Sequence, residues 1–408
     1  MTGFPRVGVF HPGSQHAWQT ATAFQEAGAL GWYATSVHFH PGSAAVRLGE
    51  RVSKRLKREL LRRHFPLLDP AKVRRFGVIE FAEIAARRLH WERAAHHLNV
   101  AGNRRFGAQA IRLIRREPVD VVWGYNSSSL EVFRWAKGQG LTCVLDQTIG
   151  HPAAMNAALQ GEAERHPAYL RAGYRPFDAR WIAQQNEEAA LADLVLCGSD
   201  FCARTIIAQG CDSAKIRVVP YGYDETLFSE TLPERKAPHG RPLDLLFVGQ
   251  VGLRKGAPHL LQAMDRLPES VARLTLVGRL DIPEATFARH AARVRHIPQL
   301  PRREVVAHFR NADAFVFPSL FEGSAVVLNE ALGAGLALIQ SEAAGDGARE
   351  GETGTILPEV SAEALADAIA ALHREPQRLD AWRAAAWAGR GGRRWADYRA
   401  RVRGVLAS

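Results

Sequence analysis

The chain has 408 residues, of which 47% are hydrophobic and 23% are charged, and its formal net charge is +11. This length exceeds a single ordinary core and predicts two or three domains, and the composition is that of a globular rather than a disordered protein. No apolar run reaches the roughly 18 residues of a membrane-spanning helix, and the apolar run at residues 7–10 is too short for a signal peptide. We therefore expect a cytoplasmic protein that begins directly with a strand.

Strand-like and helical segments alternate through the first half of the chain, which is the pattern of α/β proteins with parallel sheets. A helix is expected over residues 17–26, after a loop that contains Pro12, Gly13 and Ser14. Strands are expected at residues 6–10, 119–123, 141–145, 194–197 and 216–220.

The second half repeats the pattern after a break. Strands are expected at residues 243–248, 272–277, 314–317 and 336–339, and a helix at 257–265. The residues at 220–224 and the proline-rich stretch at 229–242 have the composition of a hinge and a linker. We predict one domain over residues 1–222 and a second over 223–385, with ligands bound beyond the carboxyl ends of their strands. A last helical segment, 386–408, carries an apolar stripe that must pack on another element.

The excess positive charge comes from one segment of the first domain. Between Arg47 and Glu117 there are 19 Lys or Arg residues against 7 Asp or Glu residues, with dense clusters at 54–58 and 62–64. One interpretation is the solvated face of one or two helices. The other is a surface that meets an acidic partner. An anionic membrane suits it, because each basic residue near such a surface gains about 1 kcal/mol. No nucleic-acid signature is present, so nucleic acid is not expected.

The segment after the strand at 314–317 places an acid beside a predicted helix start. Gly323 permits a tight turn, and Ser324 is expected to be the N-cap of a helix that runs to residue 333. The backbone amides of Gly323, Ser324 and Ala325 would then point at the cleft and bind an anion. Glu322 precedes this start, and Glu330 lies about two turns inside the helix.

Two carboxylates beside an anion site are suited to sugar recognition. Phosphate disfavours a carboxylate, whereas paired hydroxyls of a ribose or a hexose donate to it. The alternative is that Glu322 only favours the helix N-terminus through the dipole and Glu330 is a surface residue.

A second glycine-rich turn follows the strand at 243–248. It contains Gly249 and Gly252 and then the adjacent cations Arg254 and Lys255, just before a helix. An Arg forks onto phosphate oxygens and a Lys supplies a point charge, so the pair could neutralise a diphosphate leaving group. The alternative is a solvated basic loop. The spacing is not that of a P-loop, and no Ser or Thr follows the Lys.

Together these motifs resemble family 4 of the retaining GT-B glycosyltransferases. The resemblance rests on Glu322-x7-Glu330, on Phe-Val-Gly249 and Arg254-Lys255-Gly256, and on Pro-Tyr-Gly222-Tyr-Asp224, and it covers residues 189–372. It implies the GT-B fold, in which two doubly wound Rossmann-like α/β domains face each other across a cleft. It also implies that the closing helix at 386–408 returns to the first domain.

The resemblance implies a role for each matching residue. In the donor site, Gly249, Arg254 and Lys255 would meet the diphosphate, together with the amides of Gly323, Ser324 and Ala325. Glu322 would hold hydroxyls of the transferred sugar, and Glu330 would hold the nucleotide ribose. The backbone at Ile297 would meet the base, since residues 294–298 occupy the matching loop of the family. Gly13 would lie in the loop that closes over the reaction centre. The chain departs from the family at Gln250, where Arg is frequent, and in the loop at residues 12–14, which lacks adjacent glycines and leaves the acceptor side undefined.

A histidine on the first domain completes the predicted site. His151 follows the strand at 141–145 and resembles the family histidine that contacts the transferred sugar. His11 and His16 are alternatives because they flank another strand end. The segment 126–128 could line an acceptor pocket.

The implied reaction moves a hexose from a nucleotide diphosphate sugar to a hydroxyl of a glycan or a lipid-linked acceptor, with retention, in cell-surface polysaccharide or lipopolysaccharide assembly. No metal or other cofactor is expected, since no Asp-x-Asp motif ends a strand and none of the four cysteines forms a C-x-x-C pair. Attachment to the inner face of the membrane through the basic segment is an additional expectation. The alternatives are a GT-B nucleotide-sugar hydrolysing epimerase and a non-catalytic basic protein that binds membrane or nucleic acid.

Overall fold

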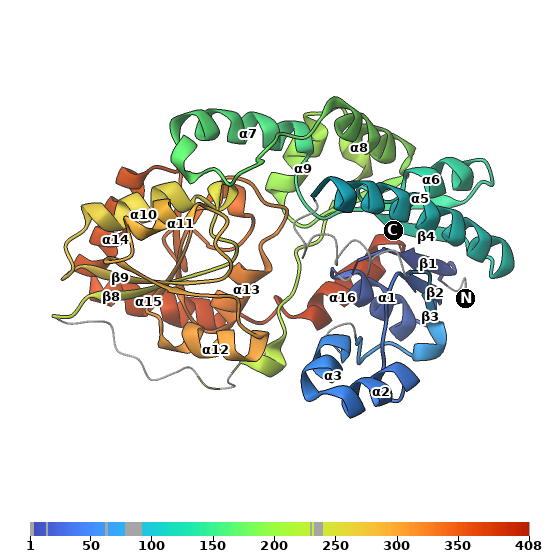
Figure 1. Cartoon of the computed structure of the whole chain (residues 1–408), viewed down its shortest axis with the longest axis horizontal. Helices are drawn as coiled ribbons and strands as arrows, with labels where there is room; N and C mark the ends of the chain where they lie inside the picture. Colours follow the sequence, from blue (N-terminus) through green and yellow to red (C-terminus); the bar gives the residue numbers. More distant parts are fainter. Residues whose placement is uncertain are drawn as a thin grey trace.

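The computed structural model describes residues 4–13, 15–61, 64–77, 92–228, 231 and 240–407. Ser14 of the predicted loop, Arg62 and Arg63 of the basic segment, and most of the proline-rich linker lie outside these residues. Two α/β bodies stand side by side, each built on one parallel sheet (Figure 1). The expected α/β class with two parallel sheets is confirmed.

The first sheet has seven strands in the order β3-β2-β1-β4-β5-β6-β7. Its strands are β1 Val7–Phe10, β2 Leu30–Thr35, β3 Val73–Arg75, β4 Val121–Tyr125, β5 Thr142–Gln147, β6 Leu194–Cys197 and β7 Ile216–Val218. Its helices are α1 Ala17–Glu26, α2 Ala44–Val52, α3 Lys54–Leu61, α5 Glu92–Arg116, α6 Leu130–Lys137, α7 Pro152–Arg165, α8 Ala179–Leu191 and α9 Asp200–Ile207, and the short 3-10 turns are η1 Pro70–Lys72, η2 Pro167–Tyr169, η3 Ser213–Lys215 and η4 Glu225–Leu227.

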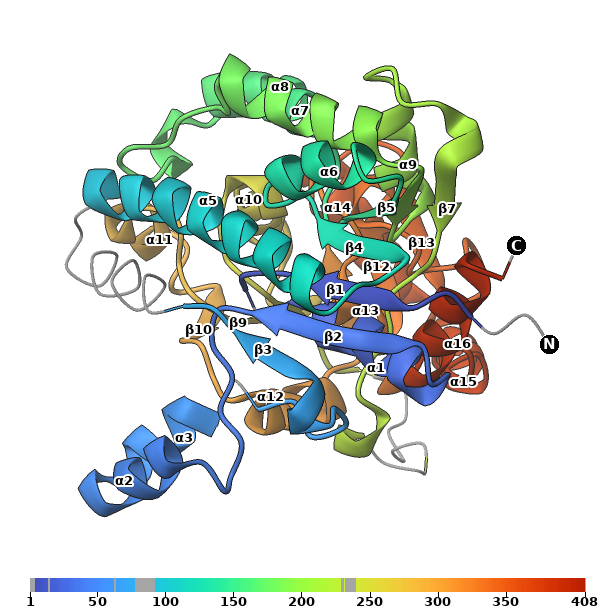
Figure 2. The same cartoon turned by 90° about the vertical axis from the view of Figure 1, so that its right-hand side faces the viewer.

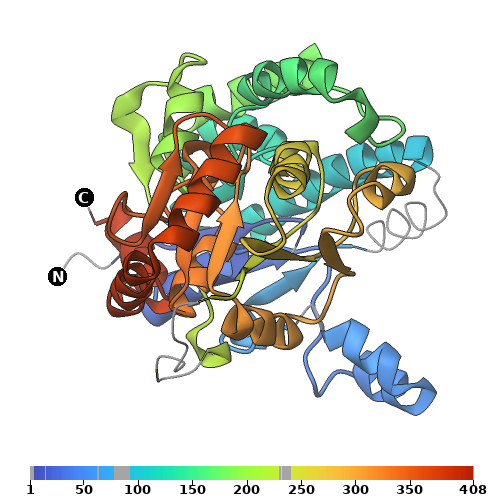
Figure 3. The same ribbon diagram turned by 90° about the vertical axis from the view of Figure 1, so that its left-hand side faces the viewer.

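The second sheet has six strands in the order β10-β9-β8-β11-β12-β13. Its strands are β8 Leu243–Val248, β9 Ala272–Val277, β10 Val294–Ile297, β11 Ala314–Phe317, β12 Ala337–Ser341 and β13 Gly354–Leu357. The helices that follow are α10 Ala257–Arg266, α11 Glu284–Ala288, α12 Arg302–Asn311, α13 Val326–Gly333, α14 Ala362–Arg374, α15 Pro376–Ala388 and α16 Trp395–Val405, with 3-10 turns η5 Leu253–Lys255 and η6 Glu342–Ala344. Figure 3 shows α10 in yellow and α14 and α15 in red beside this sheet.

Chain order reverses at one point in each sheet, between β1 and β4 and between β8 and β11. The helices on the two sides of such a point diverge, so a crevice opens beyond the carboxyl ends of the two strands. The segments after β8 and β11 carry the predicted donor residues. The fold therefore brings them to the position where open α/β sheets bind ligands.

The strands named from the sequence are all present, and most of them are largely buried apolar runs. The exception is β7, which contains Arg217 and the exposed Val218. Strands β2 and β3 were not predicted. Residues 294–298 were predicted as a loop, which is wrong: Val294–Ile297 pairs with β9 as β10. Its four residues include Arg295 and His296, so the apolar signal of a buried strand is weak.

Helix α16 leaves the second body and packs on α1 of the first (Figure 1). The Tyr398 hydroxyl lies 2.9 Å from Thr20 Oγ1, and Arg399 donates to Glu26 at 2.7 Å. Tyr398 and Val402 of the predicted stripe are fully buried, in a cluster with residues of the first sheet. The apolar stripe of α16 thus packs on the first body, which the chain leaves near residue 222.

Helices α2 and α3 project from the first body, away from its sheet (Figures 2 and 3). They carry part of the basic segment, and the side chains of Leu48 and Val52 on α2 are 63% and 69% exposed. Among the described helices, none combines the length and the apolar character that crossing a bilayer requires.

Candidate donor-binding site

Two glycines form the floor of the crevice at the switch point of the second sheet. Gly249 directly follows β8 and Gly278 directly follows β9, with φ of 150° and 147°. A Cβ on Gly278 would lie 1.9 Å from the carbonyl oxygen of Gly249, so only glycine permits this approach. The bare backbone leaves the crevice open, and Gly249 and Gly278 both line a cavity of about 1280 Å³.

The two predicted cations meet the predicted acid beside this cavity. Arg254 donates from Nη1 to Glu322 Oε1 at 2.7 Å and to the carbonyl of Phe321 at 2.8 Å. Lys255 forms an ion pair with the same Oε1, and Ser319 donates to it at 2.7 Å. One carboxylate thus faces two cations, which leaves one positive charge in excess.

Glu322 and Lys255 are held away from water, whereas 30% of the Arg254 side chain is exposed. Glu322 is 8% exposed, and the ammonium of Lys255 lies 4.6 Å from the centre of the Phe317 ring. Burial opposes ionisation of Glu322, but the charges of Lys255 and Arg254, with hydrogen bonds from Lys255 and Ser319, outweigh it and hold its pKa below the usual value. The carboxylate is therefore ionised at neutral pH and acts as a hydrogen-bond acceptor.

Glu330 also has a partner, which sequence reasoning missed. Arg302, at the start of α12, donates from Nε to Glu330 Oε1 at 2.8 Å. Arg302 and Glu330 line both the large cavity and an adjoining one of about 380 Å³ that reaches Lys255 and Glu322. No spacing rule links residues 302 and 330, because they come from helices that the sheet alone places side by side.

The helix after Glu322 begins later than the sequence predicted. Ser324 was expected to be the N-cap, which is wrong: Ala325 holds that position, without a side-chain cap, and α13 starts at Val326. The amide of Ala325 is directed to the carbonyl of Ala344 at 3.4 Å, and this contact keeps the chain extended there. Ser324 and Ala325 still line the smaller cavity with Lys255.

Ile297 ends β10, and its carbonyl accepts the amide of Gly278 at 2.9 Å, so that oxygen is already used within the sheet. Gln299 and Leu300, two and three residues further on, line the large cavity. A contact of the backbone at Ile297 with a base stays a prediction.

Two family models match the chain: Glycosyltransferase Family 4 over residues 49–227 and Glycosyl transferases group 1 over residues 242–375. The first covers β3 to β7 of the first sheet, and the second covers the whole second sheet with Arg254, Lys255 and Glu322. Leu61, which also lines the large cavity, lies in the first. The chain belongs to glycosyltransferase family 4.

Individual proteins and solved structures are also similar to the chain. D-inositol 3-phosphate glycosyltransferase of Xylanimonas cellulosilytica is 29% identical over 184 residues, which are 41% of this chain and 44% of that protein. The chain thus spans about half the length of the curated relatives it matches. Sucrose-phosphate synthase of Thermosynechococcus elongatus superposes with a TM-score of 0.69 at 17% identity, over 99% of this chain and 98% of the other. HepE of Anabaena, solved in complex with UDP-glucose, superposes with a TM-score of 0.64 at 12% identity, over 99% of each chain. These two structures support the GT-B fold.

In this family 4 glycosyltransferase the two bodies touch beside Glu322. Gly323 forms a bridge with Ile149, and the amide of Gly150 donates to the carbonyl of Glu322 at 3.2 Å. A Cβ on Gly323 would lie 2.1 Å from the carbonyl oxygen of Thr148. The residue after the acid must therefore be glycine for the first body to approach this closely.

The predicted histidine lies next to this contact but is not open to the crevice. His151 is 2% exposed, and its Nδ1 accepts the amide of Ala153 as the N-cap of α7. Burial lowers its pKa, which favours the neutral imidazole. His16 is also buried, 3.2 Å from both carboxylate oxygens of Asp146. A sugar contact by His151 stays a prediction.

The first body has its own cavity of about 450 Å³ at its switch point. It is lined by His11 and Gly13 after β1 and by Asn126, Ser127 and Ser128 after β4. The last of these loops is fixed by the buried carboxylate of Glu188, which accepts the amides of Ser127 at 2.6 Å and Ser129 at 3.0 Å. Gly13, predicted on the donor side, thus lines the cavity of the first body.

Proposed function

We propose that the chain transfers a hexose from a nucleotide diphosphate sugar to an acceptor hydroxyl with retention of the anomeric configuration. The observation that carries the proposal is the cluster of Lys255, Arg254 and Glu322 at the switch point of the second sheet, with its excess positive charge and its cavity. The diphosphate would meet the cations, and the sugar hydroxyls would donate to Glu322.

In the proposed reaction the acceptor oxygen attacks the anomeric carbon as the bond from that carbon to the diphosphate breaks. The acceptor proton passes to the departing phosphate oxygen, so a sugar–acceptor bond replaces the sugar–phosphate bond and the nucleoside diphosphate leaves. Lys255 and Arg254 would stabilise the charge that develops on the phosphate. The contact between Gly323 and residues 148–150 would keep water from the reacting bond.

The donor and acceptor classes are parts of this proposal. The complex of HepE with UDP-glucose makes a UDP-hexose the first donor to test. The acceptor would lie in the cavity between Gly13 and Asn126, which opens on the first body. A glycan or lipid-linked acceptor of surface polysaccharide assembly suits the basic, projecting α2 and α3.

Thermal unfolding of the full chain with UDP-glucose, UDP-N-acetylglucosamine and GDP-mannose tests donor binding. We expect one of them to raise the midpoint, since a ligand that binds only the folded chain stabilises it. Release of nucleoside diphosphate with and without D-inositol 3-phosphate or a membrane lipid extract then separates the reactions. Release only with an acceptor supports transfer; release without one, together with free altered sugar, indicates the hydrolysing epimerase. Failure of every nucleotide sugar to shift the midpoint contradicts the proposal.

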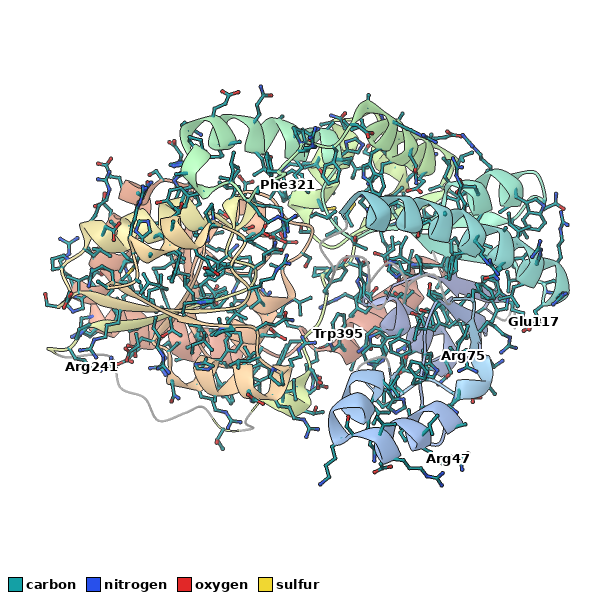
Figure 4. All side chains as sticks on the ribbon, in the orientation of Figure 1. Arg47, Arg75, Glu117, Arg241, Phe321 and Trp395 are labelled. Carbon is teal, nitrogen blue, oxygen red and sulfur yellow. The ribbon has the colours of Figure 1, made fainter. Side chains whose placement is uncertain are left out.

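Membrane attachment through α2 gives a separate prediction. Arg47 and Arg51 stand on this helix with the exposed Leu48 and Val52, so an anionic bilayer could take up both kinds of side chain (Figure 4 labels Arg47). Changing Leu48 and Val52 together to serine is expected to weaken binding to phosphatidylglycerol vesicles by about 100-fold or more, because each buried apolar side chain contributes about 1.5 kcal/mol or more and about 1.4 kcal/mol is tenfold. Ile207→Ser on α9, where the side chain is 40% exposed, is the matched control. Equal vesicle binding by both variants and the parent chain contradicts attachment through α2.

A further inference from the structure

One segment of the first body is docked on the second. Helix α7 and η2 follow β5 of the first sheet, yet Tyr169 of η2 is buried in the core of the second body. Its hydroxyl lies 2.8 Å from Nε2 of His290, and Thr286 donates to the carbonyl of Ala168 at 2.5 Å. In Figure 1, α7 lies above α10 and α11 of the second body. We call residues 152–170 the docking arm.

Three potential metal ligands converge where the docking arm meets α10. Glu162 and His166 are four residues apart at the end of α7, and His259 belongs to α10. Nε2 of His259 lies 2.6 Å from Glu162 Oε2, and Nε2 of His166 lies 3.7 Å from the same oxygen. One ligand atom from each residue lies within 4.8 Å of the others. Glu162 and His259 are buried, at 5% and 6% exposure.

These three side chains have the donor atoms that zinc prefers in proteins. Two imidazole nitrogens and one carboxylate oxygen are a frequent zinc donor set, and side chains four apart on a helix share one face. Ligand atoms at about 2.0–2.2 Å from a tetrahedral zinc lie about 3.3 Å from each other. The pair of His259 and Glu162 would therefore have to separate by less than about 1 Å, which small side-chain rotations supply.

The surroundings leave room for a cation and its fourth ligand. Arg165 pairs with Oε1 of Glu162 and leaves Oε2 directed at the histidines. The three ligands line a cavity of about 490 Å³, which can hold a water on the metal. Carboxylates of Glu342, Glu359 and Glu363 also line this cavity, and with Glu162 they outnumber its two arginines, Arg165 and Arg266.

We propose that Glu162, His166 and His259 bind a zinc ion that ties the docking arm to the second body. The residues that line this cavity and those that line the donor cavities are different, so the metal would take no part in sugar transfer. Its role is structural: it fixes the relative position of the two bodies on the side where the arm docks. The proposal stands independently of the proposed function.

Zinc binding by the full chain tests the site directly. After EDTA treatment and dialysis, titration with ZnCl2 is expected to show one tight site per chain and to raise the thermal midpoint. His166→Ala should weaken zinc affinity about 10- to 100-fold or more, and Glu162→Gln and His259→Ala similarly. His308→Ala, a half-buried histidine on α12 outside the cluster, is the matched control and should bind as the parent does.

Of the three variants, His166→Ala should disturb folding least, because His166 is less buried than Glu162 and His259. The zinc-free midpoint of each variant shows whether it is folded before the titration begins. Equal zinc affinity of folded His166→Ala and the parent chain overturns the proposal. So does a parent chain that binds no zinc after EDTA treatment.

Discussion

Changing Lys255 to methionine is expected to lower the rate constant of sugar transfer by about 100- to 1000-fold, the loss typical of removing one preorganised electrostatic contact to a transition state. Lys255 lies against Phe317 and Glu322, with 13% of its side chain exposed. Methionine keeps most of the volume of the stem and removes the charge. The excess positive charge that would meet the departing diphosphate then falls to zero, and the affinity for nucleoside diphosphate should fall as well.

Steady-state kinetics and calorimetric titration with UDP measure the two effects. Arg310→Met, an exposed cation on α12 of the same body, is the control and should leave both unchanged. Thermal unfolding distinguishes a lost contact from a lost fold. If folded Lys255→Met keeps the kinetics and UDP affinity of the parent, the diphosphate is bound elsewhere and the assignment of this cluster is wrong.

Changing Gly222 to alanine is expected to destabilise the chain by about 3 kcal/mol, at the upper end of the usual cost of overpacking. The chain passes from the first body to the second near residue 222 and returns near residue 394, and the two segments lie side by side here. The amide of Tyr223 donates to the carbonyl of Arg393 at 2.9 Å, and the amide of Trp395 donates to the carbonyl of Tyr223 at 3.2 Å. A Cβ on Gly222 would lie 2.4 Å from the nitrogen of Trp395 and 2.6 Å from the carbonyl oxygen of Arg394. These neighbours are backbone atoms and cannot rotate away. Figure 4 shows Trp395 where the chain returns to the first body.

Urea unfolding, followed by tryptophan fluorescence, measures this change. Gly391→Ala is the matched control, since a Cβ there meets nothing within 4 Å and the residue lies on the same returning segment. We expect a lower midpoint for Gly222→Ala and an unchanged one for Gly391→Ala. Equal midpoints would mean that the two segments can separate with little loss of stability, which contradicts the prediction.

Local sequence patterns predicted much of the second body. Strands such as Leu243–Val248, apolar except for Asp244, and Ala314–Phe317 are followed by glycine or proline, and their predicted limits match the structure. The start of α13 was misplaced because Ser324 has good cap chemistry, whereas a contact with distant Ala344 decides where the helix begins. β10 was missed because its polar residues conceal the strand pattern.

The predicted donor residues follow strands on either side of the switch point, so parallel-sheet topology brings them together. That is why the spacing of Glu322 and Glu330, with Arg254 and Lys255, could point to one site. The partner of Glu330 could not be predicted, because Arg302 reaches it from another helix. For His151, the resemblance predicted a contact with the transferred sugar, which stays a prediction, and only packing shows that the residue is buried as a helix cap.

The sequence by itself determined the α/β class, the family resemblance and the chemistry of the donor cluster, because these depend on residues close in sequence or repeated after each strand. Tertiary structure decided what depends on contacts between the two bodies. Gly323 must be glycine because Thr148 approaches it, and Gly222 because the chain returns beside it. The convergence of Glu162 and His166 with His259 belongs to the same class: no local pattern relates α7 to α10, and only the docking of one body on the other brings their side chains together.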